Sequence, residues 1–176
     1  HPAFEHATAK ELERLSLLKT PSDTVAVVEI PHYTFNLAEA ERGLVLALDE
    51  VQNPGNMGTI IRLADWFGIS DIICTPNSAD CFNPKVVQAT MGAILRVRVH
   101  YLDLAATLNE ARKCGVEVYG TFLEGENIYR SSLKQSGIIV MGNEGRGVSA
   151  EIGAAVSHKL LIPPYPVDRR GSESLN

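Results

Sequence analysis

The chain has 176 residues, of which 45% are hydrophobic, with a net charge of −5 at pH 7 and a sequence pI of about 5.5. This length suits one ordinary domain with a sizeable core. The charge argues against a broad basic surface for nucleic acid, although not against a local cluster of arginines. No apolar run approaches the roughly 18 residues that cross a bilayer, and no signal peptide is present. We therefore expect a soluble, cytoplasmic protein without a membrane partner.

The apolar pattern predicts helices and strands in alternation along the chain. Leucines among charges favour an amphipathic helix over 7–18, and β-branched residues before Pro31 favour a strand over 24–30. A short helical turn or linker is expected over 38–42. The further predicted strands are 44–48, 71–75, 95–99, 116–122, 138–141 and 159–162, with a loop around 124–129. The further predicted helices run from Asn56 as N-cap to Gly68, from Pro84 to about Met91, and over 102–114 and 150–156.

This alternation predicts an α/β fold, with a mostly parallel sheet flanked by helices on both faces. The pattern divides the chain into residues 1–35, which resemble the end of something larger, and a domain over 36–176. The three cysteines, Cys74, Cys81 and Cys114, are odd in number and lack zinc spacing. They predict buried or free thiols in a reducing compartment.

The densest run of glycines follows the predicted strand 138–141. Gly142, Gly145 and Gly147 stand there with Asn143, Glu144 and Arg146 between them. Glycines at this density let the backbone adopt positive φ and approach a ligand closely, and ligands bind at the carboxyl ends of strands in open α/β sheets. The local pattern also fits a plain strand-to-helix connection, with Glu144 as a solvated charge or helix cap.

Arg62 and its preceding loop form a second polar cluster. Asn-Pro-Gly-Asn-Met-Gly occupies 53–58, and an N-cap at Asn56 would put Arg62 on the first two turns of a helix. A guanidinium there can bind a phosphate or an oxygen that develops negative charge. The alternative is a surface arginine on an amphipathic helix, which is weakened by the apolar residues on either side of Arg62.

Two further clusters close the sequence. Ile-Pro-Pro-Tyr-Pro occupies 162–166, and Arg-Arg-Gly-Ser-Glu-Ser-Leu-Asn occupies 169–176. Ser172 or Ser174 is suited to cap a helix that the sequence does not contain. Because the sequence also begins without Met, we expect it to be a fragment.

Three ordered motifs resemble those of the SpoU (TrmH-type) family of RNA ribose 2′-O-methyltransferases, over about residues 43–176. The motifs are 53–62, 139–147, and 161–163 together with 173–176. Each alone is weak, but each follows a predicted strand and their order is that of the family. The resemblance implies a C-terminal trefoil knot, S-adenosylmethionine as cofactor, RNA as partner and a homodimer with its active site at the interface. It also identifies 1–35 as the remnant of a substrate-recognition domain and implies that a C-terminal helix is missing.

The resemblance also implies a role for individual residues. Arg62 would be the catalytic arginine, and a polar set would complete the catalytic site: Asn56, Glu144, Ser174 and Asn176. The cofactor-binding residues would be Thr121, Phe122, Gly142, Ile162 and Leu175. The expected reaction is methyl transfer to a ribose 2′-OH of RNA, with rRNA preferred over tRNA and no metal required.

The chemistry of this transfer leaves the role of Arg62 open. A ribose hydroxyl is a poor nucleophile, so its proton must be accepted or its developing charge stabilised. A guanidinium is normally too basic to accept a proton, which favours an electrostatic, phosphate-orienting role. Two other functions remain as alternatives at this stage: an RNA-binding family member without catalysis, and an unrelated nucleotide-binding α/β protein.

Overall fold

The computed structural model describes residues 5–16 and 20–165, and the chain divides into two units, His1–His32 and Tyr33–Asn176. In the first unit, α1 (Ala9–Leu15) confirms the predicted amphipathic helix, although it is shorter. Thr8 and Glu11 form a capping box at its start, in which each side chain satisfies the backbone N–H of the other. A local hydrogen-bond pattern therefore sets where this helix begins.

The predicted strand over 24–30 is wrong. These residues form no strand, and Val27 is 95% exposed. Their β-branched side chains suit a pleated, half-buried surface, but a strand exists only where another strand pairs with it. No such partner is found within residues 5–16 and 20–32.

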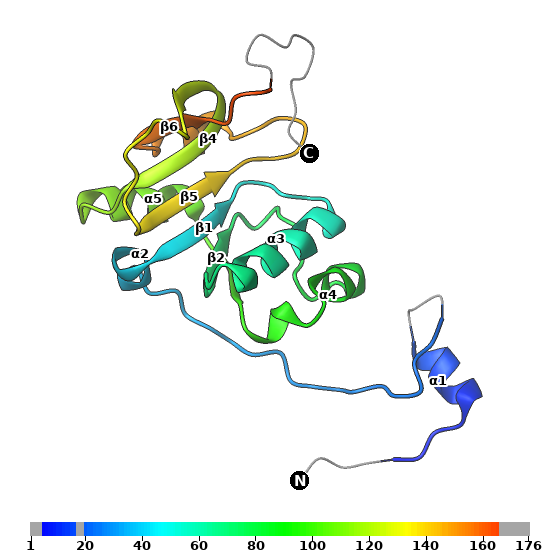
Figure 1. The fold of residues 1–176 in the computed structure, drawn as a ribbon. Helices are drawn as coiled ribbons and strands as arrows, with labels where there is room; N and C mark the ends of the chain where they lie inside the picture. Colours follow the sequence, from blue (N-terminus) through cyan, green and yellow to red (C-terminus); the bar gives the residue numbers. More distant parts are fainter. Residues whose placement is uncertain (1–4, 17–19, 166–176) are drawn as a thin grey trace. The chain divides into compact units, whose positions relative to one another are not determined.

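The second unit contains a six-stranded sheet whose paired strands are all parallel, in the order β3-β2-β1-β5-β4-β6. Figure 1 shows β1 and β5 side by side in the middle of the sheet. The strands are β1 (Leu44–Leu48), β2 (Asp71–Cys74), β3 (Arg98–Tyr101), β4 (Val118–Asn127), β5 (Gly137–Met141) and β6 (His158–Leu161). The predicted parallel α/β architecture is thus confirmed.

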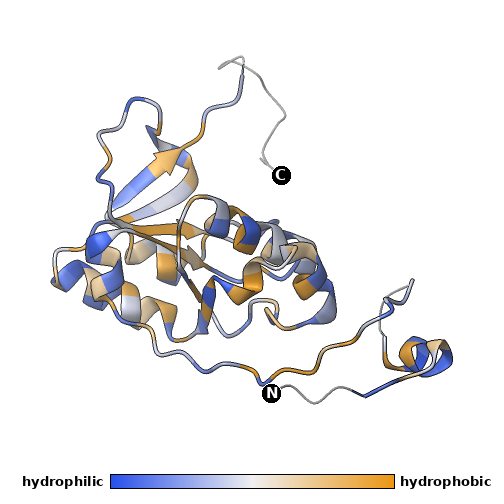
Figure 2. Ribbon diagram, turned by 60° about the horizontal axis from the view of Figure 1, so that its bottom comes forward, coloured by the Kyte–Doolittle hydropathy of each residue, from blue (hydrophilic) through white to orange (hydrophobic). Residues whose placement is uncertain are grey.

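Helices cover both faces of this sheet. The remaining helices are α2 (Ala38–Arg42), α3 (Pro54–Trp66), α4 (Pro84–Thr90), α5 (Leu104–Lys113) and α6 (Ala150–Ala154), with a 3₁₀ turn η1 (Ala93–Leu95). On β1, Val45 and Ala47 point to a core shared with α2, α5 and α6. Leu46 and Leu48 point to a core shared with α3 and α4. Figure 2 shows these central strands as the hydrophobic part of the fold. No helix of the described residues is long and apolar enough to span a membrane.

Strand β3 begins three residues later than predicted from the apolar pattern. The residue expected to start it, Leu95, instead ends a 3₁₀ turn (Ala93–Leu95) that forms after Met91 and Gly92 take positive φ. Two polar residues of the true strand, Arg98 and His100, bind the buried carboxylate of Asp71 on β2. Burial would raise the pKa of Asp71, but the hydrogen bonds from Arg98 and His100 outweigh it and lower that pKa. The apolar pattern missed the start of β3 because Arg98 and His100 are polar, and their partner Asp71 lies on another strand.

Strand β4 continues through part of the loop expected around 124–129. It pairs with β6 at Thr121, loses register, and pairs again at Glu126. Gly125 takes φ +156, and a Cβ there would lie 2.4 Å from the Lys159 carbonyl oxygen. The irregular segment 122–125 is therefore held between two paired stretches.

Gly58 allows α3 and α4 to pack closely. A Cβ at this position would lie 2.4 Å from the Ala89 Cβ and 2.8 Å from the Val86 carbonyl oxygen. We expect Gly58→Ala to lower the free energy of unfolding by about 1–3 kcal/mol, because overpacking forces the helices apart. Urea unfolding measures this, with Gly43→Ala as control because a Cβ at Gly43 meets nothing within 4 Å. Equal stability of the two variants would contradict the close packing.

Candidate active site

Two of the three sequence motifs meet at the carboxyl edge of the sheet. The first motif follows β1 and the second follows β5, and these strands are parallel neighbours with Leu48 opposite Met141. Their following loops must therefore leave the sheet side by side. Asp49 extends the ladder by donating its backbone N–H to the Met141 carbonyl at 2.9 Å.

The first loop ends in the N-cap of α3, which is Asn53 and not Asn56 as predicted. The Asn53 side-chain oxygen accepts from the backbone N–H groups of Gly55 and Asn56, at 2.8 and 3.1 Å, and Pro54 occupies the first helical turn. Asn53-Pro54 is the stronger start signal, because proline suits the first turn of a helix. Because Asn53 caps the helix, the Asn56 side chain is available for contacts outside α3.

The second loop is a tight turn closed by its own backbone. Asn143 and Gly147 exchange two hydrogen bonds of 2.9 and 2.8 Å, and the Asn143 side-chain oxygen accepts from the N–H groups of Gly145 and Arg146. A Cβ on Gly142 would lie 2.1 Å from the Gly147 carbonyl carbon, and Gly147 takes φ +71. The turn thus requires glycine at both positions.

Side chains tie the two loops together. The Asn143 amide nitrogen donates to the Glu50 carbonyl at 2.8 Å, and Arg146 forms an ion pair with the Glu50 carboxylate. At the far end, the buried carboxylate of Asp49 accepts from the Ser149 backbone N–H at 2.7 Å. The loops are consequently one cross-linked unit.

Glu144 is the central link of this unit. Its Oε1 accepts from the Asn56 amide nitrogen at 3.1 Å and from the Asn53 backbone N–H at 3.3 Å. Burial would raise the pKa of Glu144, but these hydrogen bonds and that of its own backbone lower it overall. Because a carboxylate only accepts, the Asn56 amide nitrogen must face it, and the Asn56 Oδ1 accepts no hydrogen bond from residues 5–16 or 20–165.

Arg62 does not join this cluster. It lies on the third turn of α3, later than the predicted first two turns because the cap is Asn53. Six residues of α-helix separate it from Asn56, which amounts to about 240° around the axis and about 9 Å along it. Its side chain is exposed and makes no hydrogen bond or ion pair with any residue in the described part of the chain.

The four described residues of the predicted cofactor set lie on the adjacent strands β5, β4 and β6. Gly142 follows β5, Thr121 and Phe122 stand at the register shift of β4, and Ile162 follows β6. The Thr121 hydroxyl donates to the Val140 carbonyl at 3.2 Å, and Lys159 Nζ lies 4.9 Å from the centre of the Phe122 ring. Their backbones thus share one side of the carboxyl edge.

The rest of the third motif lies outside the described residues. Leu175 of the cofactor set and Ser174 and Asn176 of the catalytic set belong to 166–176. The trefoil knot also depends on the path of this segment. These assignments and the knot remain predictions.

Known proteins match the chain through the region that contains these loops. The model of the SpoU rRNA Methylase family matches residues 43–176. The chain belongs to the SpoU family.

Relatives of this SpoU chain share much of its sequence. It is 35% identical over 159 residues to the 23S rRNA (guanosine(2553)-2′-O)-methyltransferase RlmP of Bacillus subtilis, covering 90% of this chain and 61% of RlmP. A solved structure from the TrmH family of RNA methyltransferases, from Porphyromonas gingivalis, is 39% identical with a TM-score of 0.77, covering 94% of this chain and 65% of that one. An AdoMet-bound rRNA methyltransferase from Sinorhizobium meliloti is 34% identical with a TM-score of 0.68, covering 76% and 51%. The chain thus spans about three fifths of RlmP.

The sequence motifs assign no role to three residues that build the two loops of the site, although Asn53 and Asn143 lie within these motifs. Asn53 caps α3, and Asn143 closes the glycine-rich turn. Glu50 accepts a hydrogen bond from Asn143 at its carbonyl and forms an ion pair with Arg146 through its carboxylate. Local signals existed for the first two, since Asn before Pro favours a helix start and Asn in a turn bonds the backbone two residues later. Glu50 carries no such signal, because the side chains that donate to it, Asn77, Asn143 and Arg146, lie 27, 93 and 96 residues away.

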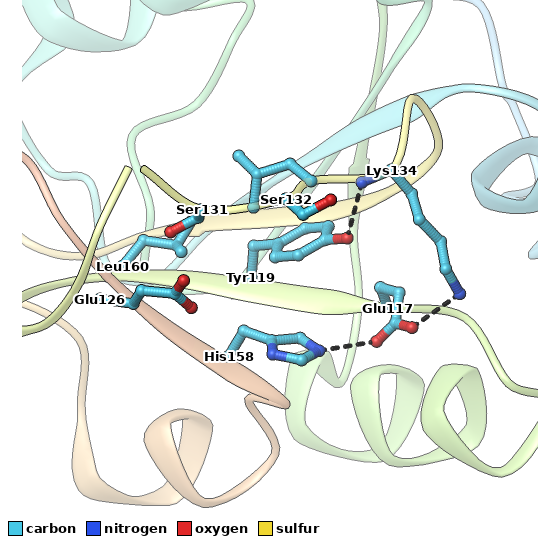
Figure 3. A pocket seen from close by; sticks show the side chains of 9 residues that line it. Glu117, Tyr119, Glu126, Ser131, Ser132, Lys134, His158 and Leu160 are labelled. Carbon is cyan, nitrogen blue, oxygen red and sulfur yellow. Dashed lines mark hydrogen bonds and ion pairs between the residues drawn. The ribbon is translucent and has the colours of Figure 1, made fainter. Parts of the chain in front are cut away.

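A separate cavity of about 120 Å³ lies against β4 and β6, and contains none of the predicted site residues. Figure 3 shows how its side chains bind one another. The Glu117 carboxylate bonds Lys134 Nζ at 2.7 Å and His158 Nε2 at 2.9 Å, which lowers the pKa of Glu117. The Lys134 backbone N–H donates to the Tyr119 hydroxyl at 3.1 Å. These contacts fasten the loop before β5 onto the sheet.

The lowered pKa of Glu144 predicts a pH-dependent contribution to stability. A carboxyl with a lowered folded-state pKa stabilises the fold above its unfolded pKa, near 4.5, and loses this as the pH falls through the folded value. We expect wild type to be more stable than Glu144→Gln above pH 5, with a difference that shrinks below pH 4.5. Urea midpoints across this range measure it.

Glu110→Gln is the matched control for this series. Glu110 is exposed on α5, and its side chain makes no hydrogen bond or ion pair among the residues described. Its replacement should leave the pH dependence of the urea midpoint close to that of wild type. A Glu144→Gln profile that runs parallel to wild type would contradict the Glu144 link.

Proposed function

We propose that this chain is the methyl-transferring part of an S-adenosylmethionine-dependent RNA ribose 2′-O-methyltransferase, with rRNA slightly favoured over tRNA as its substrate. The observation that carries the proposal is the link from Glu144 to Asn56, which joins two SpoU motifs into one polar edge. The names of RlmP and of the Sinorhizobium enzyme support RNA, and rRNA in particular, as the substrate. Since bacterial rRNA lies in the cytoplasm, the protein would act there.

The carboxyl edge of β5, β4 and β6 fits a nucleoside cofactor. Gly142 has no room for a side chain, so its backbone remains bare, and the segment 122–125 has no partner residues on β6. Backbone groups at Gly142, Thr121, Phe122 and Ile162 would hold the adenine and ribose, with Leu175 after them. S-adenosylmethionine would supply an electrophilic methyl group on its sulfonium.

The geometry of Glu144 favours an anchoring role over a role as base. Its pKa is lowered and its Oε1 already accepts two hydrogen bonds, so it is a weak proton acceptor at neutral pH. It would instead hold Asn56, whose Oδ1 can accept a hydrogen bond from the acceptor 2′-OH. Ser174 and Asn176 would complete this polar site.

Arg62 would act in the site of a second copy of the chain. It cannot turn toward Asn56 on its own helix, and it has no partner in the described part of the chain. A guanidinium from the other copy can bind the RNA phosphate and stabilise the alkoxide that develops during transfer. A two-fold homodimer would form two such composite sites.

Removal of Arg62 tests its catalytic role. We expect Arg62→Ala to reduce kcat for RNA methylation by about 10²–10³-fold, since loss of one stabilising donor typically costs this much. The dissociation constant for S-adenosylhomocysteine, measured by calorimetry, should stay unchanged. Arg42→Ala is the matched control, because Arg42 is also exposed but lies before β1, at the opposite edge of the sheet.

Mixing two inactive variants tests whether the site is shared. Arg62→Ala and Asn56→Ala should each be inactive alone, while random exchange of subunits should restore about a quarter of the wild-type sites. Labelled methyl incorporation into rRNA after mixing measures this. Full activity of Arg62→Ala would refute its assigned role, and absence of recovery on mixing would refute the shared site.

A further inference from the structure

Trp66 is an exposed aromatic residue that the site described above does not use. It is the last residue of α3 and the single tryptophan of the sequence, and it is 82% exposed. A large apolar ring is rarely left in solvent without a partner. Its position therefore raises the question of what it binds.

Other exposed apolar side chains stand on or directly after α3, α4 and η1, elements that pack on one another. The strongly exposed members are Leu63, Phe67, Met91 and Leu95. Exposed apolar side chains gathered on packed elements are typical of an interaction site. We call these four residues and Trp66 the α3–η1 surface.

The charges around the α3–η1 surface suit a polyanion. Across α3, α4, η1 and its C-cap residue, three cations, Arg62, Lys85 and Arg96, stand against one carboxylate, Asp65. Arg96 neutralises Asp65 through two hydrogen bonds of 2.9 and 2.7 Å. Within the described residues, Arg62 and Lys85 have no ion pair. This local excess of positive charge contrasts with the net charge of −5.

Trp66 lies one helical turn beyond Arg62. Residues four apart on a helix share a face, with about 5–6 Å between their Cβ atoms, which is within the size of one nucleotide. An arginine that binds a phosphate would therefore bring the adjoining base over the Trp66 ring. Bases stack on exposed aromatic side chains, and this contact tolerates different sequences.

We propose that Trp66 is a stacking platform for an unpaired base next to the nucleotide that Arg62 orients. This rests on the proposed function, because it takes RNA as substrate and assigns the phosphate contact to Arg62. Trp66 is a positioning residue: it touches a neighbouring base and not the reacting ribose. The substrate class is accordingly RNA with single-stranded bases at the target, rather than a continuous duplex.

The fluorescence of Trp66 tests the contact directly. As the only tryptophan, it reports on its own environment without labelling. We expect a single-stranded RNA oligonucleotide to quench this fluorescence, with a midpoint that matches binding measured by the anisotropy of a dye on the RNA. The apparent affinity should fall with added salt, because phosphate contacts release counterions.

Kinetics of three variants separates stacking from a general apolar contact. Trp66→Ala should raise KM for RNA by roughly 5- to 150-fold, the range expected for one stacked base, with little change in kcat or in KM for S-adenosylmethionine. Trp66→Phe should recover most of the affinity, since it keeps an aromatic face. The control Leu95→Ala removes another exposed apolar side chain of the same surface, 79% exposed, and should leave KM near wild type.

Three results would overturn the proposal. RNA that binds and is methylated without quenching Trp66 excludes stacking and leaves the proposed function intact. A blue shift that depends on protein concentration alone, with Trp66→Ala and Leu95→Ala both weakening self-association, assigns the α3–η1 surface to a protein interface. Absence of both RNA binding and methyl transfer in the wild type refutes the proposed function as well as the stacking platform.

Discussion

The carboxylate of Glu144 holds together the two loops on which the candidate site depends. Parallel pairing of β1 with β5 brings these loops to the same edge, but pairing alone would not determine their separation. Glu144 fixes it by accepting from Asn53 and Asn56, across about ninety residues of sequence, together with the contacts of Asn143 and Arg146 to Glu50. Since these donors stand at the start of α3, the same contact also sets where that helix begins relative to the glycine-rich turn. The orientation of the rest of α3, including Arg62 and Trp66, is set by its packing in the core and against α4.

Helix α3 places its functional side chains on two different faces. Its first turn faces the glycine-rich turn through Asn56, and its later turns present Arg62 and Trp66 to solvent. Met57, Ile61 and Ala64 form a buried stripe on α3 that packs into the core. This packing prevents the helix from rotating about its axis and keeps the two faces in place. Close approach of α4 at Gly58 strengthens this constraint. A single chain therefore holds Asn56 and Arg62 apart, and this separation is what supports the proposal of a site shared between two copies.

Local sequence patterns predicted the elements that are buried on both faces. The strands at 44–48 and 138–141 are short apolar runs, and both were predicted within one residue of their observed bounds. Prediction failed where the deciding partner is distant or absent. Residues 24–30 have strand-like side chains but pair with no strand among the described residues, and β3 contains polar residues whose partner, Asp71, lies on another strand. The choice of Asn56 as N-cap overlooked the stronger signal of Asn53 before Pro54.

The sequence by itself determined the parallel α/β class, the SpoU motifs and the residue types of the site, because short-range patterns of apolar, glycine and capping residues encode these features. Tertiary structure alone decided which of the site residues meet. It joined Glu144 to Asn56, drew Glu50 into the loop contacts, and turned Arg62 away from Asn56. These outcomes depend on strand order and on the rotation of one helix about its axis. Neither quantity is a property of a local stretch of sequence, since both arise only when the sheet is assembled and the core is packed.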